Sequence, residues 1–181
     1  MRGYELNLSK KRYTVDMKRY IVILFSIGVV FSSLAFHYME RVPAPELKFR
    51  TLTGDTLSLS QYKGKVVLID FWASWCGGCK MNRKNHALFQ EEHAKDTMLV
   101  ILNLSVDRNE DKWRAAVKSW PVHGNNALVL SSYESVLDKD YSVHSIPRYV
   151  LIDKNGYIYT FKAGWPGEQI LEDDVRKLLS E

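Results

Sequence analysis

Cysteine is scarce in this chain, with two in 181 positions. Both lie in one motif, Cys76-Gly77-Gly78-Cys79, and no second C-x-x-C pair accompanies it. A structural zinc site needs four ligands, and His86 and His93, two helical turns apart, are poorly placed to complete one. A c-type haem site needs a histidine directly after the second cysteine, where this chain has Lys80. The sequence therefore argues against a metal site and excludes covalently bound haem.

Positive charge is also lacking where a nucleic-acid-binding domain would need it. The formal net charge is +4, with six basic against two acidic residues in residues 1–20 and 19 of each sign in the remainder. The excess belongs to an N-terminal tail, so composition gives no support for binding nucleic acid. The sequence shows no internal repeat, and residues 46–181 suffice for one core but not for two.

Residues 20–39 carry no Lys, Arg, Asp or Glu. A helix of this length spans about 30 Å, the hydrocarbon thickness of a bilayer. The basic tail 1–19 then predicts a retained signal-anchor, with the tail in the cytoplasm and the rest outside the inner membrane, in the periplasm or its equivalent. Because Ser33-Leu34-Ala35 resembles a signal-peptide cleavage site, cleavage is the alternative. Residues 40–45 form a short linker to a domain over 46–181.

Hydrophobic patterning predicts an α/β domain with a mixed central sheet sandwiched by helices. An N-terminal β-hairpin extension precedes a βαβ unit and a ββα unit. The central strand is apolar almost throughout, which suits a strand covered on both faces. The helix after it is expected to turn Met81, Leu88 and Phe89 inward. The predicted strands are 47–51, 56–59, 65–72, 98–105, 127–130, 149–153 and 157–162, and the predicted helices are 77–93, 107–119, 132–140 and 167–179, the last with Ile170 among its apolar positions.

The central strand leads directly into the C-x-x-C pair, where a helix starts. Unpaired N–H groups and the macrodipole at a helix N-terminus favour a thiolate, the attacking species in disulfide exchange. We therefore expect Cys76 to be the nucleophile and Cys79, one turn further on, the resolving thiol. A purely structural disulfide would close too short a loop to stabilise the fold much. The basic residues of the first helical turns either add positive potential near the dithiol or form a solvated face: Lys80, Arg83 and Lys84.

Asp70 interrupts the apolar strand six residues before Cys76. A carboxyl group in such surroundings suits acid–base work on a thiol. The alternative is an aspartate at a frayed strand end that bonds to the backbone.

The string VVLIDFWASWCGGCK over residues 66–80 resembles the active-site strand and helix start of the thioredoxin superfamily. Matching segments at 45–59, at 64–65 and at Ser145-Ile146-Pro147 make it most similar to membrane-anchored TlpA/ResA-type thiol–disulfide oxidoreductases. The resemblance implies a thioredoxin-like fold that needs no cofactor, with Cys76 and Cys79 as the dithiol. It implies that Asp70 relays a proton to the second cysteine. It also implies substrate contacts: Trp75, Gly77, Gly78, the backbone of Ile146, and Pro147 as the cis-proline beside the dithiol.

Two departures from this family pattern matter. Gly78 stands where relatives most often have proline, which loosens the helix start, so the redox potential does not carry over from them. Thioredoxins also place a lysine near the buried acid, and the strand 98–104 has none. A third open point is His144, which either tunes Cys76 or is an ordinary loop histidine.

These observations predict an extracytoplasmic enzyme that reduces disulfides of exported proteins, such as apocytochromes, with electrons from a membrane donor. A disulfide oxidase or isomerase using the same residues is the first alternative. A copper- or metal-handling binding protein on the same fold is the second, for which only His123 or His144 could serve as the downstream histidine.

Overall fold

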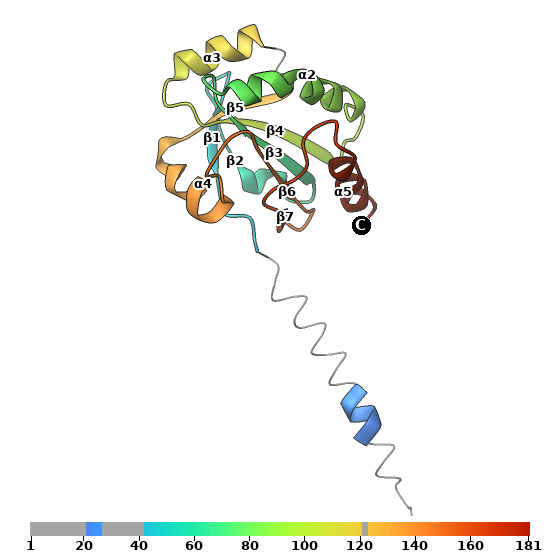
Figure 1. Ribbon diagram of the computed structural model, residues 1–181. Coiled ribbons are helices and arrows are strands. Elements are labelled where there is room, and N and C mark those ends of the chain that lie inside the picture. Colours follow the sequence, from blue (N-terminus) through green and yellow to red (C-terminus); the bar gives the residue numbers. More distant parts are fainter. Residues whose placement is uncertain (1–20, 27–41, 121–122) are drawn as a thin grey trace, which may run out of the picture. The chain divides into compact units, whose positions relative to one another are not determined.

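The computed structural model describes residues 21–26, 42–120 and 123–181. The chain divides into two compact units, Met1–Glu40 and Arg41–Glu181. The second unit holds a seven-stranded sheet in the order β2-β1-β5-β4-β3-β6-β7 (Figure 1). Its strands are β1 (Lys48–Thr51), β2 (Thr56–Ser58), β3 (Val66–Trp72), β4 (Leu99–Ser105), β5 (Asn125–Val129), β6 (Arg148–Ile152) and β7 (Ile158–Thr160).

The sheet is mixed, as the sequence predicts. Strand β3 runs parallel to β4 and antiparallel to β6, while the β1–β2 hairpin extends the sheet beyond β5 through antiparallel pairing. Every residue of β3 is buried. The predicted hairpin extension and the interior position of the strand before the cysteines are thus confirmed.

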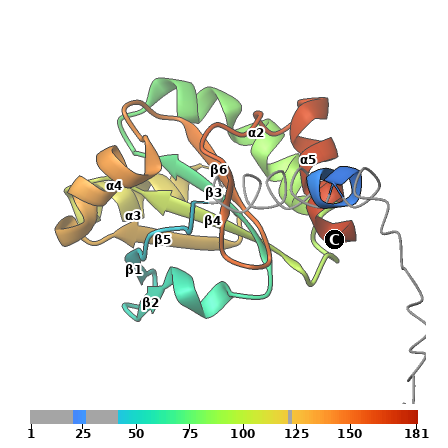
Figure 2. The same cartoon turned by 90° about the horizontal axis from the view of Figure 1, so that it is seen from below.

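Helices cover both faces of this sheet (Figure 2). One face packs against α2, α3 and α5, and the other against α4 and the short η1 helix. Because side chains alternate along a strand, β3 contributes to both cores. The helices are η1 (Leu59–Tyr62), α2 (Gly77–Glu92), α3 (Glu110–Ser119), η2 (Ser131–Tyr133), α4 (Glu134–Tyr141) and α5 (Gln169–Ser180).

Glycines with left-handed backbone conformations occupy the turns of the two hairpins. Gly54 between β1 and β2, and Gly156 between β6 and β7, have φ of +93° and +86°. These left-handed values favour glycine, which lacks a Cβ. The Asn155-Gly156 pair in the sequence therefore marks the β6–β7 connection correctly.

The inward positions predicted on α2 are partly wrong. Phe89 is buried, but Met81 is 84% exposed and Leu88 is exposed as well. The buried side of α2 instead carries Cys79 and the polar side chains of Asn82, Arg83 and His86. The spacing of apolar residues did not predict this side of α2, because the part of the sheet that it covers also carries buried polar side chains. On α5, Ile170 is likewise exposed, while Leu171, Val175 and Leu178 are buried.

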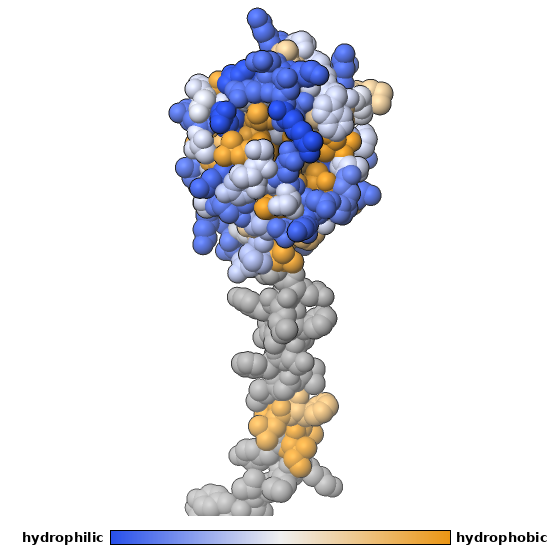
Figure 3. All heavy atoms as spheres, turned by 90° about the vertical axis from the view of Figure 1, so that its left-hand side faces the viewer, coloured by the Kyte–Doolittle hydropathy of each residue, from blue (hydrophilic) through white to orange (hydrophobic). Residues whose placement is uncertain are grey.

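In the first unit, residues 21–26 are helical, and Ile21–Phe25 expose apolar side chains (Figure 3). The predicted tail 1–19 and most of the predicted anchor 20–39 lie outside the described residues. Within the described residues, we find no helix with the length and hydropathy needed to span a membrane.

Candidate active site

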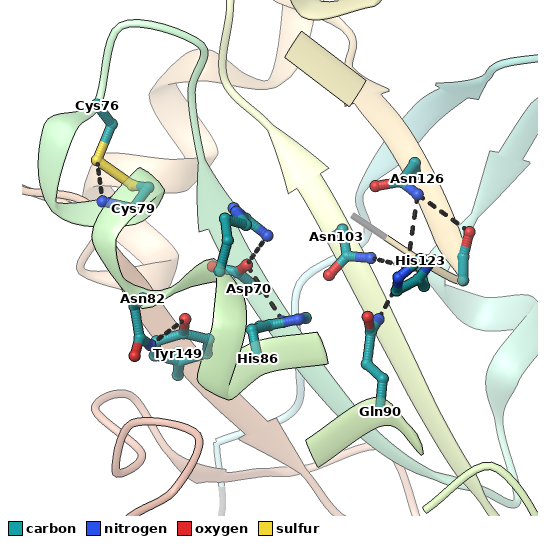
Figure 4. Close-up of polar contacts among 12 residues, drawn as sticks. Asp70, Cys76, Cys79, Asn82, His86, Gln90, Asn103, His123, Asn126 and Tyr149 are labelled. Carbon is teal, nitrogen blue, oxygen red and sulfur yellow. Dashed lines mark hydrogen bonds and ion pairs between the residues drawn. A yellow bond between two sulfur atoms is a disulfide. The ribbon is translucent and has the colours of Figure 1, made fainter. Parts of the chain in front are cut away.

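The two cysteines lie where β3 gives way to α2 (Figure 4). Cys76 is the N-cap of α2, and its Sγ accepts a hydrogen bond from the Cys79 N–H at 3.1 Å. The two sulfurs form a disulfide. Both cysteines are buried, whereas the preceding Trp75 is 69% exposed. The pair therefore sits at a helix N-terminus beside an exposed aromatic side chain, as the sequence predicts.

The loop before β6 lies against the helix start. The Ile146–Pro147 peptide bond is cis. A Cβ placed on Gly78 would lie 3.4 Å from Pro147 Cδ, whereas one on Gly77 would meet no neighbour within 4 Å. Ile146 packs against the apolar cluster that contains both sulfurs. The structure thus brings together the dithiol, both glycines and the proline loop.

Asp70 is fully buried within β3. Its Oδ2 lies 3.0 Å from Arg83 Nη1 and 3.3 Å from His86 Nε2 (Figure 4). The strand ladder continues beyond it to Trp72. The alternative of an aspartate at a frayed strand end is therefore wrong, and the contacts of this carboxylate are with side chains of α2.

Arg83 supplies the cation that the strand 98–104 lacks. Its side chain is 3% exposed, while Lys80 and Lys84 are exposed. The guanidinium carbon also lies 4.5 Å from the centroid of the Trp72 ring. The interpretation of the basic residues as a solvated face thus holds for the two lysines and is wrong for Arg83.

Two more titratable groups surround the ion pair. Burial lowers the pKa of His86 below its ordinary value of 6.5, against the opposing attraction of the Asp70 carboxylate. Burial likewise raises the pKa of Tyr149, and the nearby Asp70 charge adds to the rise. Asn82 Nδ2 donates a hydrogen bond to Tyr149 Oη at 3.1 Å. The imidazole of His86 and the phenol of Tyr149 are therefore neutral at pH 7. The salt bridge at this site is the one between Asp70 and Arg83.

Asp70 belongs to a buried polar row that crosses four strands. Asn126, Asn103, Asp70 and Tyr149 are successive register partners on β5, β4, β3 and β6. Asn103 Nδ2 donates to the His123 carbonyl at 2.7 Å. Asn103 of this polar row thus holds the backbone at His123 in place. Asp70 of the same row lies under α2.

Asp107, which follows β4, is a site residue that sequence reasoning missed. Its carboxylate accepts hydrogen bonds from the Ser74 N–H at 2.8 Å and from Ser74 Oγ at 2.7 Å. It also accepts one from Ser105 Oγ at 2.7 Å. Ser74 lies two residues before Cys76, so Asp107 ties the dithiol loop to the end of the neighbouring strand. An acidic residue just after a parallel neighbour strand was the signal available in the sequence.

A groove of about 780 Å³ borders Trp75 and Ile146. His144 lines it, and its Nδ1 lies 2.6 Å from Asp138 Oδ1, with both side chains about two-thirds exposed. The contact made by His144 is thus a hydrogen bond at the surface. Within the described residues, no cluster of three or more His, Cys, Asp or Glu side chains could hold a metal ion.

Comparison with known proteins agrees with this geometry. A family model described as Redoxin matches residues 39–178. The chain belongs to the Redoxin family. It is 30% identical over 142 residues to the thioredoxin-like protein YneN of Bacillus subtilis, covering 75% of this chain and 78% of that protein. It is 27% identical over 168 residues to the thiol-disulfide oxidoreductase ResA of Bacillus subtilis, covering 91% and 92% of the two chains.

Solved structures support the same assignment. The thioredoxin domain of a thiol-disulfide oxidoreductase from Bacteroides vulgatus matches with a TM-score of 0.66 and 28% identity, over 76% of this chain and 95% of that one. A thiol:disulfide interchange protein from Bacteroides sp. matches with a TM-score of 0.67 and 26% identity, over 78% and 90%. This Redoxin-family chain is a thioredoxin-like thiol–disulfide oxidoreductase, and its general substrates are thiols and disulfides.

Proposed function

We propose that this enzyme reduces disulfides of exported proteins through its Cys76/Cys79 dithiol. The observation that carries the proposal is the disulfide at the N-terminus of α2, with Cys76 as the N-cap. In its reduced form the same position favours a thiolate at Cys76, because the helix end offers N–H donors and a positive dipole end.

The reaction takes two exchanges. The Cys76 thiolate attacks a substrate disulfide, a mixed disulfide forms, and one substrate sulfur leaves as a thiolate. Cys79 then attacks Cys76 and releases the second substrate sulfur, which leaves the oxidised pair. The Cys79 thiol loses a proton in this step, and we assign Asp70 as the acceptor because it is a buried carboxylate on the adjoining strand. Two electrons from a donor restore the dithiol.

Substrate recognition is assigned to the surface around the pair. Trp75, Gly77 and Gly78 are sequence neighbours of the two cysteines. We assign the backbone of Ile146, which precedes the cis-proline Pro147, to pairing with an extended substrate peptide. Asp107 acts indirectly by holding the loop that carries Trp75.

The extracytoplasmic location is proposed from the basic tail and the apolar segment 20–39. Because compartments outside the cytoplasm are oxidising, a reductant there needs a membrane electron donor. Alkaline washing of membranes tests the location, and a mature chain starting near residue 36 would contradict the anchor.

The direction of electron flow is tested by the redox potential of the pair. The full chain is equilibrated in thiol–disulfide buffers of graded potential, and its oxidised fraction is measured by alkylation. A potential of about −270 mV supports a reductant, whereas about −120 mV would identify an oxidant.

The order of the two cysteines is tested by trapping. Cys79→Ala should accumulate mixed disulfides with substrate proteins, because the resolving thiol is gone. The matched control Cys76→Ala should accumulate none. Equal trapping by both variants would contradict the assigned roles.

A further inference from the structure

The outer side of α2 next to the dithiol carries two lysines and a methionine. Lys80 and Lys84 are both exposed, and their spacing of four residues places them on the same face of the helix. Met81 is 84% exposed, more than any other large apolar side chain in the described part of the chain. At about 1.5 Å per residue, all three lie within about 8 Å of Cys79 along the helix axis.

This arrangement disfavours the free domain. Cations in the first turns of a helix oppose its dipole, and like charges four residues apart repel each other. Helices α3, α4 and α5 each have an acidic residue in the first turn and a basic one in the last, whereas α2 has neither. Met81 adds apolar surface that water must cover. Such features are expected where a partner covers them during function.

A second exposed apolar side chain lies on the loop before α5. A Cβ added to Gly167 would lie 3.7 Å from the Asn85 side chain, so this loop lies against α2. Asn85 follows Met81 by four residues and lies on the same side of the helix. Trp165, on the same loop, is 45% exposed. Four exposed side chains together form what we call the α2 face: Lys80, Met81, Lys84 and Trp165.

The uncompensated charge of the α2 face is positive. Within the described residues neither lysine forms an ion pair, and Lys80 Nζ lies 5.9 Å from the centroid of the Trp120 ring. The next acidic residue along α2 is Glu91, about 10 Å beyond Lys84. On the loop, Glu168 Oε2 already accepts a hydrogen bond from the Trp165 N–H at 2.8 Å. The surface complementary to the α2 face is therefore acidic and partly apolar.

We propose that the α2 face binds the disulfide substrate and selects polypeptides with carboxylates and an apolar side chain next to the cysteine. The carboxylates lie against Lys80 and Lys84, and the apolar side chain against Met81 and Trp165. The Cys76/Cys79 dithiol is oxidised to a disulfide, and the substrate disulfide is reduced to two thiols, which receive the two electrons and two protons. This inference rests on the proposed reduction of substrate disulfides.

Three peptide disulfides that differ only in charge test this selection. Each is a symmetric dimer of a short peptide that contains one cysteine, one leucine and either glutamate, glutamine or lysine on both sides of the cysteine. The rate constant for reduction by the reduced full chain is measured by acid quenching and chromatography. It is divided by the rate constant of the same peptide with dithiothreitol, which removes the effect of flanking charge on the intrinsic reactivity of the disulfide.

We expect the glutamate peptide to be reduced about 10-fold faster than the glutamine peptide, which is the lower end of the range for electrostatically steered association. The lysine peptide should react slowest. This preference should be present at about 0.1 M salt, where the Debye length is about 10 Å, and should vanish at about 1 M, where it is about 3 Å.

Variants of exposed lysines locate the preference. Lys80→Gln/Lys84→Gln should reduce the ratio of the glutamate to the glutamine rate to less than about threefold. The matched control Lys63→Gln/Lys65→Gln also removes two exposed lysines, but these precede β3, whereas the cysteines follow it. A strand of this length separates them from the dithiol by about 20 Å, so the ratio should stay at its native value. Circular dichroism checks that both variants fold.

The outcomes distinguish this inference from the proposed function. Equal, salt-independent rates for the three peptides would overturn the selection and leave the reduction of disulfides intact. An unchanged ratio in Lys80→Gln/Lys84→Gln would also overturn it, even if all three rates fell together, because the lysines would then act on the dithiol and not on the substrate. Failure of the native chain to reduce any of the peptides would contradict the proposed function itself.

Discussion

The two faces of β3 carry different tasks. Val67, Ile69 and Phe71 enter a large apolar core with α4, whereas Asp70 and Trp72 on the other face meet α2. The first face has only the usual requirements of packing. The second combines apolar packing with a buried ion pair and the disulfide. The polar and redox groups thus lie on one side of the strand, while the other side serves packing alone.

The largest loss of stability is expected from a charge placed on the apolar face of β3. Ile69→Asp buries a carboxylate where the core offers it no partner, at a cost of several kcal/mol. This approaches the whole stability of an ordinary domain, about 5–15 kcal/mol. We expect loss of the folded state by circular dichroism. The control Ile69→Val should cost only about 0.5–1.5 kcal/mol.

The next effect comes from the ion pair on the opposite face. Arg83→Met alone leaves the Asp70 charge buried and unpaired, which should lower the free energy of unfolding by about 3–5 kcal/mol. Adding Asp70→Leu should recover most of this loss, because an apolar pair avoids the desolvation of both charges. Urea unfolding of the four chains in this cycle measures the coupling. Equal costs of Arg83→Met in both backgrounds would show that the pair is not coupled.

Removing the support of the dithiol loop should have a smaller effect. Asp107→Ala leaves the donors of the half-buried Ser74 and the buried Ser105 without their acceptor, at about 1–3 kcal/mol. A displaced loop should also slow disulfide exchange, by up to about 100-fold. The control is Glu134→Ala, which breaks an exposed ion pair with Arg108 at the same groove and should cost less than about 1 kcal/mol. Unchanged insulin-disulfide reduction by Asp107→Ala would contradict the positioning role.

The smallest expected effect is the pH dependence from His86. Because burial lowers its pKa in the folded chain, the unfolded chain binds more protons below pH 6.5. The stabilisation is therefore complete above that pH and declines as the pH falls below it. His86→Gln should remove a slope on the order of 1 kcal/mol per pH unit from urea unfolding measured at several pH values. The exposed His123→Gln serves as control and should keep the slope.

The strands, the helices and the dithiol could be predicted because their signals are local. The apolar run before the cysteines gave β3 within one residue, and the helix predicted over 77–93 is observed as Gly77–Glu92. The cis-proline beside the pair followed from the family resemblance, and it is present at Pro147.

The buried side of α2 could not be predicted from the sequence. Apolar periodicity assumes an apolar sheet, so it turned Met81 and Leu88 inward. Asp70 does not fit that assumption, because burying a carboxylate is costly unless an opposite charge or hydrogen-bond donors lie beside it. The partner proved to be Arg83, thirteen residues further along the chain, which only the packing of α2 on β3 could reveal. Asp107 escaped notice for the same reason, since its contact with Ser74 joins two strand ends.

Helix α2 holds both sulfurs, the guanidinium and the imidazole, while the carboxylate alone comes from the sheet. The groups around the disulfide therefore come from only two places in the chain, which are α2 with its N-cap and one strand position. A protein engineer could graft residues 76–86 and a single aspartate onto another parallel-stranded scaffold. The transplanted segment would bring its own counter-charge with it.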